Sequence, residues 1–271
     1  MAAALAGLMF GGSLVACDDV RTVAEQTFTP STEGVLTVAV SLPAPGYWEF
    51  DAAGEPVGGF EYEIAQALAD RFELRLEVID VPFERIVAGD LGGADLALSQ
   101  ITVTSEREAF VQFSTPYYRS AAGVLARDGK DVRDLKTARD LSWGVRAGTT
   151  DETLVNDIIR PDRVQSFADE LRCAQAVAAG EVDACLIDLP TALVIDNSVE
   201  GVQTVAQFLT DEQWAVALPN GAAHADRNRE VVDAGLRLMA SDGALDRWAD
   251  EWLTPLFATD PADVPVIEAR T

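Results

Sequence analysis

Three polar groups stand just beyond apolar runs of the sequence. Arg107 follows the apolar run 94–98 after a stretch rich in hydroxyl groups, the Gly-Thr-Thr turn 148–150 precedes a predicted helix, and Asp188 follows the apolar run 182–187. An arginine offers a planar fork of donors that matches a carboxylate. A helix N-terminus attracts anions, and a carboxylate attracts an ammonium. Together these groups predict a site for a small zwitterion.

Alternating strand and helix patterns position these groups. The apolar spacing predicts strands at 35–40, 74–79 and 95–99, with a helix at 60–72 whose apolar residues recur every fourth position. The alternation restarts with strands at 142–146, 164–167 and 182–187 and a helix at 168–179, and a strand at 214–218 precedes helices at 225–240 and 245–253. Such alternation is typical of parallel sheets with helical crossovers.

Two units of similar size follow from this pattern, the first interrupted by the second. We expect a signal segment at 1–17, a tether at 18–33, a first lobe at 34–124 and 214–257, a second lobe at 125–213, and a C-terminal tail at 258–271. Two chain crossings, near 123–128 and 212–220, would form a hinge. Because open α/β sheets bind ligands at the carboxyl ends of their strands, the cleft between the lobes is the expected site.

The composition excludes several classes of partner. The 271 residues carry 20 basic and 45 acidic side chains and a formal charge of −25, so nucleic acid and anionic lipid are not expected partners. With 48% hydrophobic residues, the chain can form a proper core. The single histidine and three cysteines form no metal-ligand spacing. We therefore expect no metal site and no cofactor.

The N-terminus has the features of an export signal. Residues 1–16 are apolar and uncharged, and they are too few for a membrane span of about 20 residues. Residues 14–17 (LVAC) resemble the bacterial lipobox, which implies lipid attachment at Cys17; the absence of Lys or Arg before it departs from the pattern. The alternative is an ordinary secreted protein with a chance cysteine. We expect an exported protein, lipid-anchored on the outer side of the cytoplasmic membrane or in the periplasm.

Cys173 and Cys185 remain once Cys17 is set aside. An even number of cysteines in an exported protein suggests a disulfide. Both also lie in apolar patterns, so two buried free thiols are the alternative.

Five segments occur in an order that closely resembles the bacterial extracellular solute-binding proteins of family 3, the polar amino acid receptors of ABC importers. They are GFEYEIA (59–65), TVTSER (102–107), FSTPYY (113–118), GVRAGTT (144–150) and GEVDA (180–184). The resemblance implies an α/β fold of the type II periplasmic-binding-protein class, with two lobes joined by a two-crossing hinge. It also implies a non-enzymatic monomer that binds a small amino acid and delivers it to an ABC transporter permease.

The resemblance assigns roles at the carboxylate end of the ligand. Arg107 would clamp the α-carboxylate, and Thr102 would donate its N–H to the carboxylate and its hydroxyl to the ammonium. Thr150, with Thr149 beside it, would close on the carboxylate from the second lobe.

At the other end, the Gln100 carbonyl and Asp188 would accept from the ammonium. Phe83 falls where the family places an aromatic ring against the ligand side chain. Ser41 stands where an acidic residue often serves cationic side chains, so lysine or arginine is less supported as ligand. Tyr47, in an aromatic loop, is expected near the pocket.

Other interpretations stay open. Arg107 would pair with Glu106 or Glu108 if it were an ordinary surface arginine. Asp188 would cap the helix that begins at Leu189 if its role were structural. Phe83 would then be plain core. A different function on the same scaffold is a cyclohexadienyl or arogenate dehydratase, which uses a cleft carboxylate as acid; Asp188 is the only candidate for that role.

Overall fold

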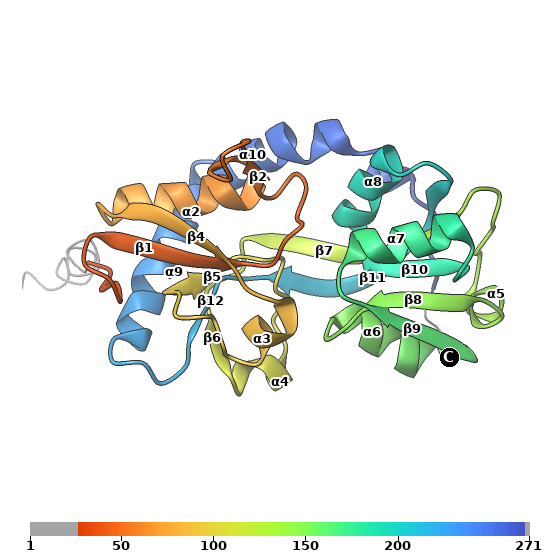
Figure 1. Ribbon diagram of the computed structural model, residues 1–271, viewed down its shortest axis with the longest axis horizontal. Coiled ribbons are helices and arrows are strands. Elements are labelled where there is room, and N and C mark those ends of the chain that lie inside the picture. The colour runs from red at the N-terminus through yellow and green to blue at the C-terminus, as the bar shows by residue number, and fades with distance from the viewer. Residues whose placement is uncertain (1–26, 269–271) are drawn as a thin grey trace, which may run out of the picture.

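The computed structural model describes residues 27–268, which form two lobes side by side (Figure 1). The predicted signal segment, including Cys17, lies outside the described residues. The first lobe is built on a five-stranded sheet of order β4-β1-β5-β12-β6. Its strands are β1 (Val35–Val40), β4 (Arg75–Asp80), β5 (Leu96–Ala97), β6 (Val111–Phe113) and β12 (Ala217–Pro219). Its helices are α2 (Phe60–Arg71), α3 (Phe83–Val87), α4 (Ser105–Glu108), α9 (Ala225–Ser241) and α10 (Ala244–Trp252).

The second lobe has a five-stranded sheet of order β11-β7-β10-β8-β9. Its strands are β7 (Tyr118–Arg127), β8 (Ser142–Arg146), β9 (Arg163–Phe167), β10 (Ala184–Asp188) and β11 (Val202–Trp214). Its helices are α5 (Leu135–Arg139), α6 (Thr150–Leu154), α7 (Glu170–Ala179) and α8 (Leu189–Ser198), and a π-helical turn (Val155–Ile159) continues α6. A two-stranded ribbon, β2 (Glu49–Phe50) with β3 (Pro56–Gly58), and short 3₁₀ turns at Thr254–Leu256 and Pro261–Asp263 complete the chain.

Parallel pairing places the strand ends of each lobe at one edge. β1 pairs in parallel with β4 and β5, and β8 pairs in parallel with β9 and β10. The sheets are mixed, however, because β12 runs antiparallel to β5 and β7 runs antiparallel to β10. An all-parallel arrangement was expected, and the antiparallel strands are those that carry the chain between the lobes or back from the crossing.

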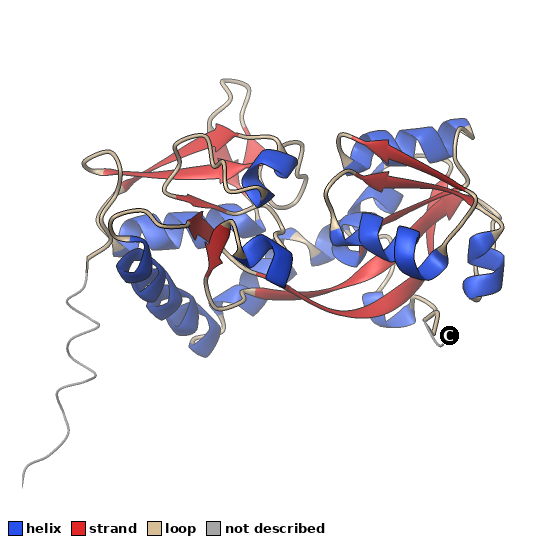
Figure 2. Cartoon of the chain, turned by 90° about the horizontal axis from the view of Figure 1, so that it is seen from below, coloured by secondary structure: helices blue, strands red, loops and turns tan. Residues whose placement is uncertain are grey.

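Two long strands connect the lobes (Figure 2). β7 and β11 pair antiparallel from Tyr118 opposite Trp214 to Arg127 opposite Val202, and their register shifts between Phe208 and Glu212. The expected boundary at 124/125 falls inside β7, whose residues 122–126 already pair with β10. Residues 202–213 were not predicted as a strand, because polar residues interrupt their apolar alternation.

Both chain ends of the described region pack against the lobes. Phe28 is buried and stacks on Phe72 with ring centroids 5.0 Å apart, and Thr29 exchanges two backbone hydrogen bonds with the Asn228 side chain. The expectation of a flexible tether therefore does not hold for these residues. At the other end, the backbone N–H of Gln207 donates to the carbonyl oxygen of Pro265, and the Gln207 carbonyl oxygen accepts from the N–H of Ile267. Val266 thereby pairs in parallel with Gln207 and extends the second sheet beside β11.

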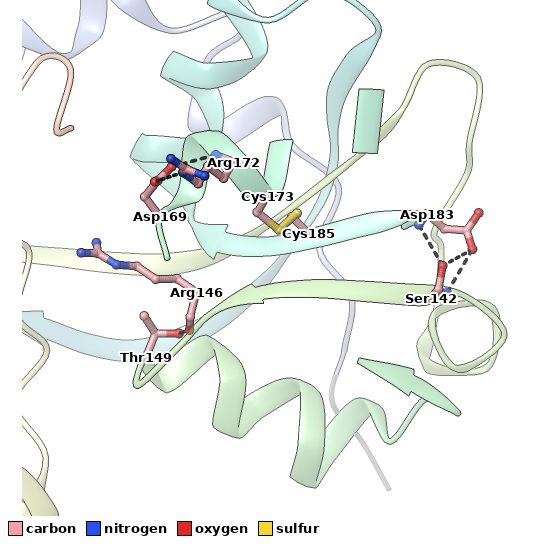
Figure 3. The surroundings of a disulfide bond; sticks show 8 residues. All are labelled: Ser142, Arg146, Thr149, Asp169, Arg172, Cys173, Asp183 and Cys185. Atoms are coloured by element: carbon pink, nitrogen blue, oxygen red, sulfur yellow. Dashed lines mark hydrogen bonds and ion pairs between the residues drawn. A yellow bond between two sulfur atoms is a disulfide. The ribbon is translucent and has the colours of Figure 1, made fainter. Parts of the chain in front are cut away.

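A disulfide between Cys173 and Cys185 ties α7 to β10, the strand that ends in Asp188 (Figure 3). Gly144 on β8 makes room for it, because a Cβ there would lie 2.4 Å from the sulfur of Cys173. The two cysteines are 12 residues apart in the sequence. In the chain-entropy model, a disulfide that closes a loop of this length stabilises the folded state by about 3 kcal/mol.

We expect reduction of this disulfide to lower the free energy of unfolding by about 3 kcal/mol. Urea unfolding of the protein with and without reductant measures the difference. A variant with both cysteines replaced by alanine is the control and should not respond to reductant. Equal midpoints for the oxidised and reduced wild-type protein would contradict the expectation.

A buried carboxyl group holds the chain that follows β5. Glu61, in the first turn of α2, is fully buried and accepts hydrogen bonds from Trp48 Nε1 (3.0 Å), the backbone N–H of Gln100 (2.8 Å), the Gln100 side-chain amide and the Tyr117 hydroxyl. Gln100 adopts a left-handed backbone conformation with φ of 49°, which is uncommon for a residue with a side chain. The bonds to Glu61 compensate for that conformation and fix the segment that leads to Thr102.

Burial raises the pKa of Glu61 to about 7, although its hydrogen bonds oppose the shift. A carboxyl with a folded-state pKa above its unfolded value loses stabilisation as pH rises through that range. We therefore expect the unfolding free energy of the wild-type protein to fall relative to Glu61→Gln between pH 5 and pH 8. Carboxyl ¹³C NMR tests the cause directly: one glutamate signal, absent in Glu61→Gln, should titrate near pH 7, and a midpoint at or below about 4.5 would contradict it.

Candidate functional site

The carboxyl ends of the parallel strands face each other across the two lobes. Arg146, the last residue of β8, donates from Nη2 to the hydroxyl oxygen of Ser41, which follows β1, over 2.6 Å. Arg107 of the first lobe donates from Nη2 to the carbonyl oxygen of Gly148 in the second lobe over 3.0 Å. The residues that follow β1 and β5 in the first lobe therefore meet residues at the end of β8 in the second lobe.

Arg107 lies buried at this junction and has no acidic partner. The guanidinium donates to the carbonyl oxygens of Thr102 (2.7 Å) and Gly148 (3.0 Å). Within residues 27–268 it forms no ion pair, so the surface pairing with Glu106 or Glu108 does not occur. Burial lowers the pKa of Arg107, and nearby acidic side chains oppose this shift. A buried cation held only by carbonyl dipoles is suited to receive an anion.

The short helix α4 positions Arg107. The hydroxyl of Thr104 caps this helix by accepting from the Arg107 backbone N–H over 3.2 Å. Thr102 is buried, and its carbonyl receives the guanidinium as described above. Gln100 is directed inward, because its side-chain amide is bonded to Glu61.

Asp188 is the last residue of β10 and occupies the N-cap position of α8, but its side chain makes no capping hydrogen bond. Its Oδ1 accepts from the Ser120 hydroxyl over 3.1 Å, and Ser120 belongs to the crossing strand β7. Burial raises the pKa of Asp188 well above its usual value, and the neighbouring acids Asp151, Glu212 and Glu170 raise it further. An ammonium placed here would reverse that shift.

Phe83 is covered by two guanidinium groups rather than being only a core residue. Arg146 lies over the ring at 4.4 Å from its centroid and Arg107 at 5.3 Å. Arg146 also forms a buried ion pair with Glu170 at 2.9 Å, and it extends from β8 away from the disulfide (Figure 3). Arg146 was not among the predicted site residues, although it is an arginine at the carboxyl end of a predicted strand, the edge where ligand-binding residues were expected.

Tyr47 makes a further contact between the lobes. Its hydroxyl lies 3.2 Å from the Thr191 hydroxyl on α8, and its ring packs edge-on against Trp214. Tyr47 is only 1% exposed, and burial raises the pKa of its hydroxyl well above 10.0, so it stays neutral. Its predicted place near the inter-lobe region agrees with these contacts.

Thr149 and Thr150 begin helix α6 beside Arg107. The Thr149 hydroxyl caps the helix by accepting from the Glu152 backbone N–H, and it donates to the Arg146 carbonyl oxygen over 2.8 Å. Both threonines line an inter-lobe pocket of about 600 Å³ together with Arg107. The Thr149 side chain is thus occupied by the helix, which leaves Thr150 as the better candidate for a ligand contact.

Residues 27–268 contain neither a metal-binding cluster nor a membrane-spanning helix. No group of histidine, cysteine, aspartate or glutamate side chains there gathers closely enough to hold a metal ion. No helix in the same range has the length and apolarity needed to cross a membrane.

Comparisons with known proteins agree with this geometry. Residues 36–255 match the model of the bacterial extracellular solute-binding proteins, family 3. The chain is 27% identical over 256 residues to the L-cystine-binding protein TcyJ of Escherichia coli K12, covering 92% of this chain and 94% of that protein. It is 30% identical over 269 residues to the membrane-bound lytic murein transglycosylase F of Aeromonas salmonicida, covering 91% of this chain but 50% of that enzyme.

Solved structures confirm the predicted fold class. An ancestral arginine-binding protein bound to arginine superposes with a TM-score of 0.72 at 27% identity, covering 81% of this chain and 98% of that one. The two α/β lobes and their two connecting strands are therefore the type II periplasmic-binding arrangement. The family match spans well over half of the sequence, and it includes every segment that carries the inter-lobe contacts. The chain belongs to the bacterial extracellular solute-binding proteins, family 3.

Proposed function

We propose that the protein binds a small amino acid between its lobes and delivers it to the permease of an ABC importer. The observation that supports this most strongly is a pair of opposite charges without ionic partners, one in each lobe. Among residues 27–268, the Arg107 guanidinium donates to the carbonyl oxygens of Thr102 and Gly148, and Asp188 accepts from the neutral hydroxyl of Ser120. A ligand carboxylate at Arg107 and a ligand ammonium at Asp188 would satisfy both groups.

An unpaired buried charge is unfavourable, whereas a buried charge that is paired and hydrogen-bonded is tolerated. A zwitterion supplies both missing charges at once, but only when the two lobes are close together. Binding therefore favours the closed arrangement over an open one by the free energy of the second set of contacts. The strands β7 and β11 are the natural place for the motion, because their pairing is irregular between Phe208 and Glu212.

Direct contacts between the lobes would support the closed state. They are the hydrogen bonds from Arg146 to Ser41, from Arg107 to Gly148, and between Tyr47 and Thr191. Each joins a residue of the first lobe to one of the second. Opening would break all three hydrogen bonds. They would therefore stabilise the closed state without contributing to ligand binding by the open state.

The relatives indicate the ligand class. TcyJ is named for L-cystine, and the superposed ancestral protein holds arginine. We propose that the ligand of this protein is an amino acid. We also propose that the protein is a non-enzymatic monomer that acts outside the cytoplasm. Lipid attachment at Cys17 remains part of this proposal.

An enzymatic role on the same fold is the second candidate. The observation that favours it is the position of Asp188 at the end of β10, where burial raises the pKa of its carboxyl in the direction that a proton donor requires. Incubation with prephenate or arogenate, followed by absorbance, separates the two: loss of carboxyl and water supports the dehydratase, and an unchanged substrate supports the binding protein.

Replacing Arg107 tests the binding proposal. Titration calorimetry against a panel of amino acids identifies the best ligand, and Arg107→Ala should weaken it at least about 100-fold, because a buried charge-assisted clamp is lost. Arg75→Ala removes an exposed arginine of the same lobe and is the matched control, with no expected change. An unchanged affinity in Arg107→Ala would show that the carboxylate is held elsewhere.

A further inference from the structure

Two acidic side chains near Asp188 lack the partners that buried carboxylates normally have. Asp151, in the first turn of α6, is only 4% exposed, and its Oδ1 accepts no hydrogen bond. Glu212, on the crossing strand β11, is half-buried as a residue, but its Oε2 is buried and has no hydrogen-bond donor within residues 27–268. Most buried polar atoms are hydrogen-bonded, so two unsatisfied acids in one region require an explanation.

These acids face the inter-lobe site. Burial raises the pKa of Asp151 well above its usual value; Glu212 from β11 and Glu170 from α7 raise it further, and Arg107 from α4 lowers it. Burial also raises the pKa of Asp188, at the end of β10, and Asp151, Glu212 and Glu170 raise it further. Their positions agree with this influence. Glu212 on β11 pairs with Ser120 on β7, whose hydroxyl donates to Asp188. Asp151 directly follows Thr150, which lines the inter-lobe pocket with Arg107.

A structural role does not account for Asp151. An aspartate in the first turn of a helix is favourable, but it is normally solvated or bonded to backbone N–H groups. Here Thr149 already provides the side-chain cap, and α6 has only five residues. Burying Asp151 without a donor therefore costs stability that the helix does not recover.

The charges of the site are unequal even with a zwitterion in place. Arg146 is already paired with Glu170. In the proposed function, the ligand carboxylate takes Arg107 and the ligand ammonium takes Asp188. Asp151 and Glu212 are then left without a cation.

A metal ion does not fit this surplus, because no group of acids in residues 27–268 gathers closely enough to hold one. A larger organic cation suits acids that are spread over α6 and β11. Such a group donates several hydrogen bonds in different directions and spreads its charge.

We infer that the ligand carries a second positively charged group, besides its α-ammonium, and that Asp151 and Glu212 recognise it. This inference rests on the proposed function and narrows its ligand class to diamino or guanidino amino acids, or to an amino acid with a second ammonium such as cystine. The serine at position 41, where an acid often serves cationic side chains, made lysine or arginine less supported as ligand. In this inference, Asp151 of the second lobe and Glu212 of the crossing strand take the place of that acid.

Calorimetry of the full-length exported protein tests the inference with lysine, arginine, ornithine, cystine, glutamine and glutamate. We expect one of the ligands with a second positive group to bind at least about 30-fold more tightly than glutamine, as for a desolvated charge pair worth about 2 kcal/mol. Asp151→Asn and Glu212→Gln should each reduce that ratio about tenfold. Asp211→Asn, which removes an exposed acid next to Glu212 on the same strand, is the matched control and should leave the ratio unchanged.

A second readout does not depend on the variants. Binding enthalpies measured in two buffers of different ionisation enthalpy give the number of protons released. A second cation should release more protons than glutamine does, because it lets a further buried acid ionise.

The outcomes separate this inference from the proposed function. If amino acids bind and Arg107→Ala abolishes binding, but the best ligand has no second positive group or the ratio survives in both acid variants, the inference is overturned and the function stands. If none of the amino acids binds, both fall. A preference for cystine over lysine and arginine supports the second ammonium and excludes the side-chain cations as its source.

Discussion

Arg107 places a guanidinium inside the protein with no acidic side chain within ion-pairing distance among residues 27–268. Two carbonyl oxygens, one from each lobe, hold it in place. A charge buried in this way is unfavourable unless an anion arrives from outside the chain. The capped helix α4, the bonded segment after β5 and the turn before α6 all serve to keep the guanidinium at the junction of the lobes.

The second lobe carries the complementary excess of acid. Asp188, Asp151 and Glu212 come from three different elements, so no single motif produces the negative field. In the proposed function, a zwitterion between the lobes would neutralise both kinds of group at once. Recognition of charge would then be coupled to closure, with the irregular pairing of β7 with β11 as the proposed hinge.

Much of this arrangement follows from the sequence. Ser41 and Asp188 stand at the ends of buried strands, and Arg107 lies in the short helix α4 that follows β5. Parallel pairing brings such strand ends to one edge. The strand Ser142–Arg146 was predicted with the bounds that it has in the structure. These features are local, so apolar spacing and turn chemistry suffice to find them.

Other features depend on contacts between distant segments. Arg146 lies within the motif 144–150 and Asp151 follows it directly, but a motif does not show whether a charge is already neutralised. Arg146 has its partner in Glu170, whereas Asp151 has none for its Oδ1. The strand β11 was missed because its residues 202–213 owe their conformation to pairing with β7 rather than to their own alternation. The packing of Phe28 on Phe72 likewise could not be read from a polar segment.

A crystal structure of the protein with the amino acid that binds most tightly is the most direct measurement of the central claim. It should show the α-carboxylate within hydrogen-bonding distance of the Arg107 guanidinium and the α-ammonium at Asp188, with both lobes in contact with one molecule. A ligand held by a single lobe, or one whose carboxylate lies away from Arg107, would contradict it.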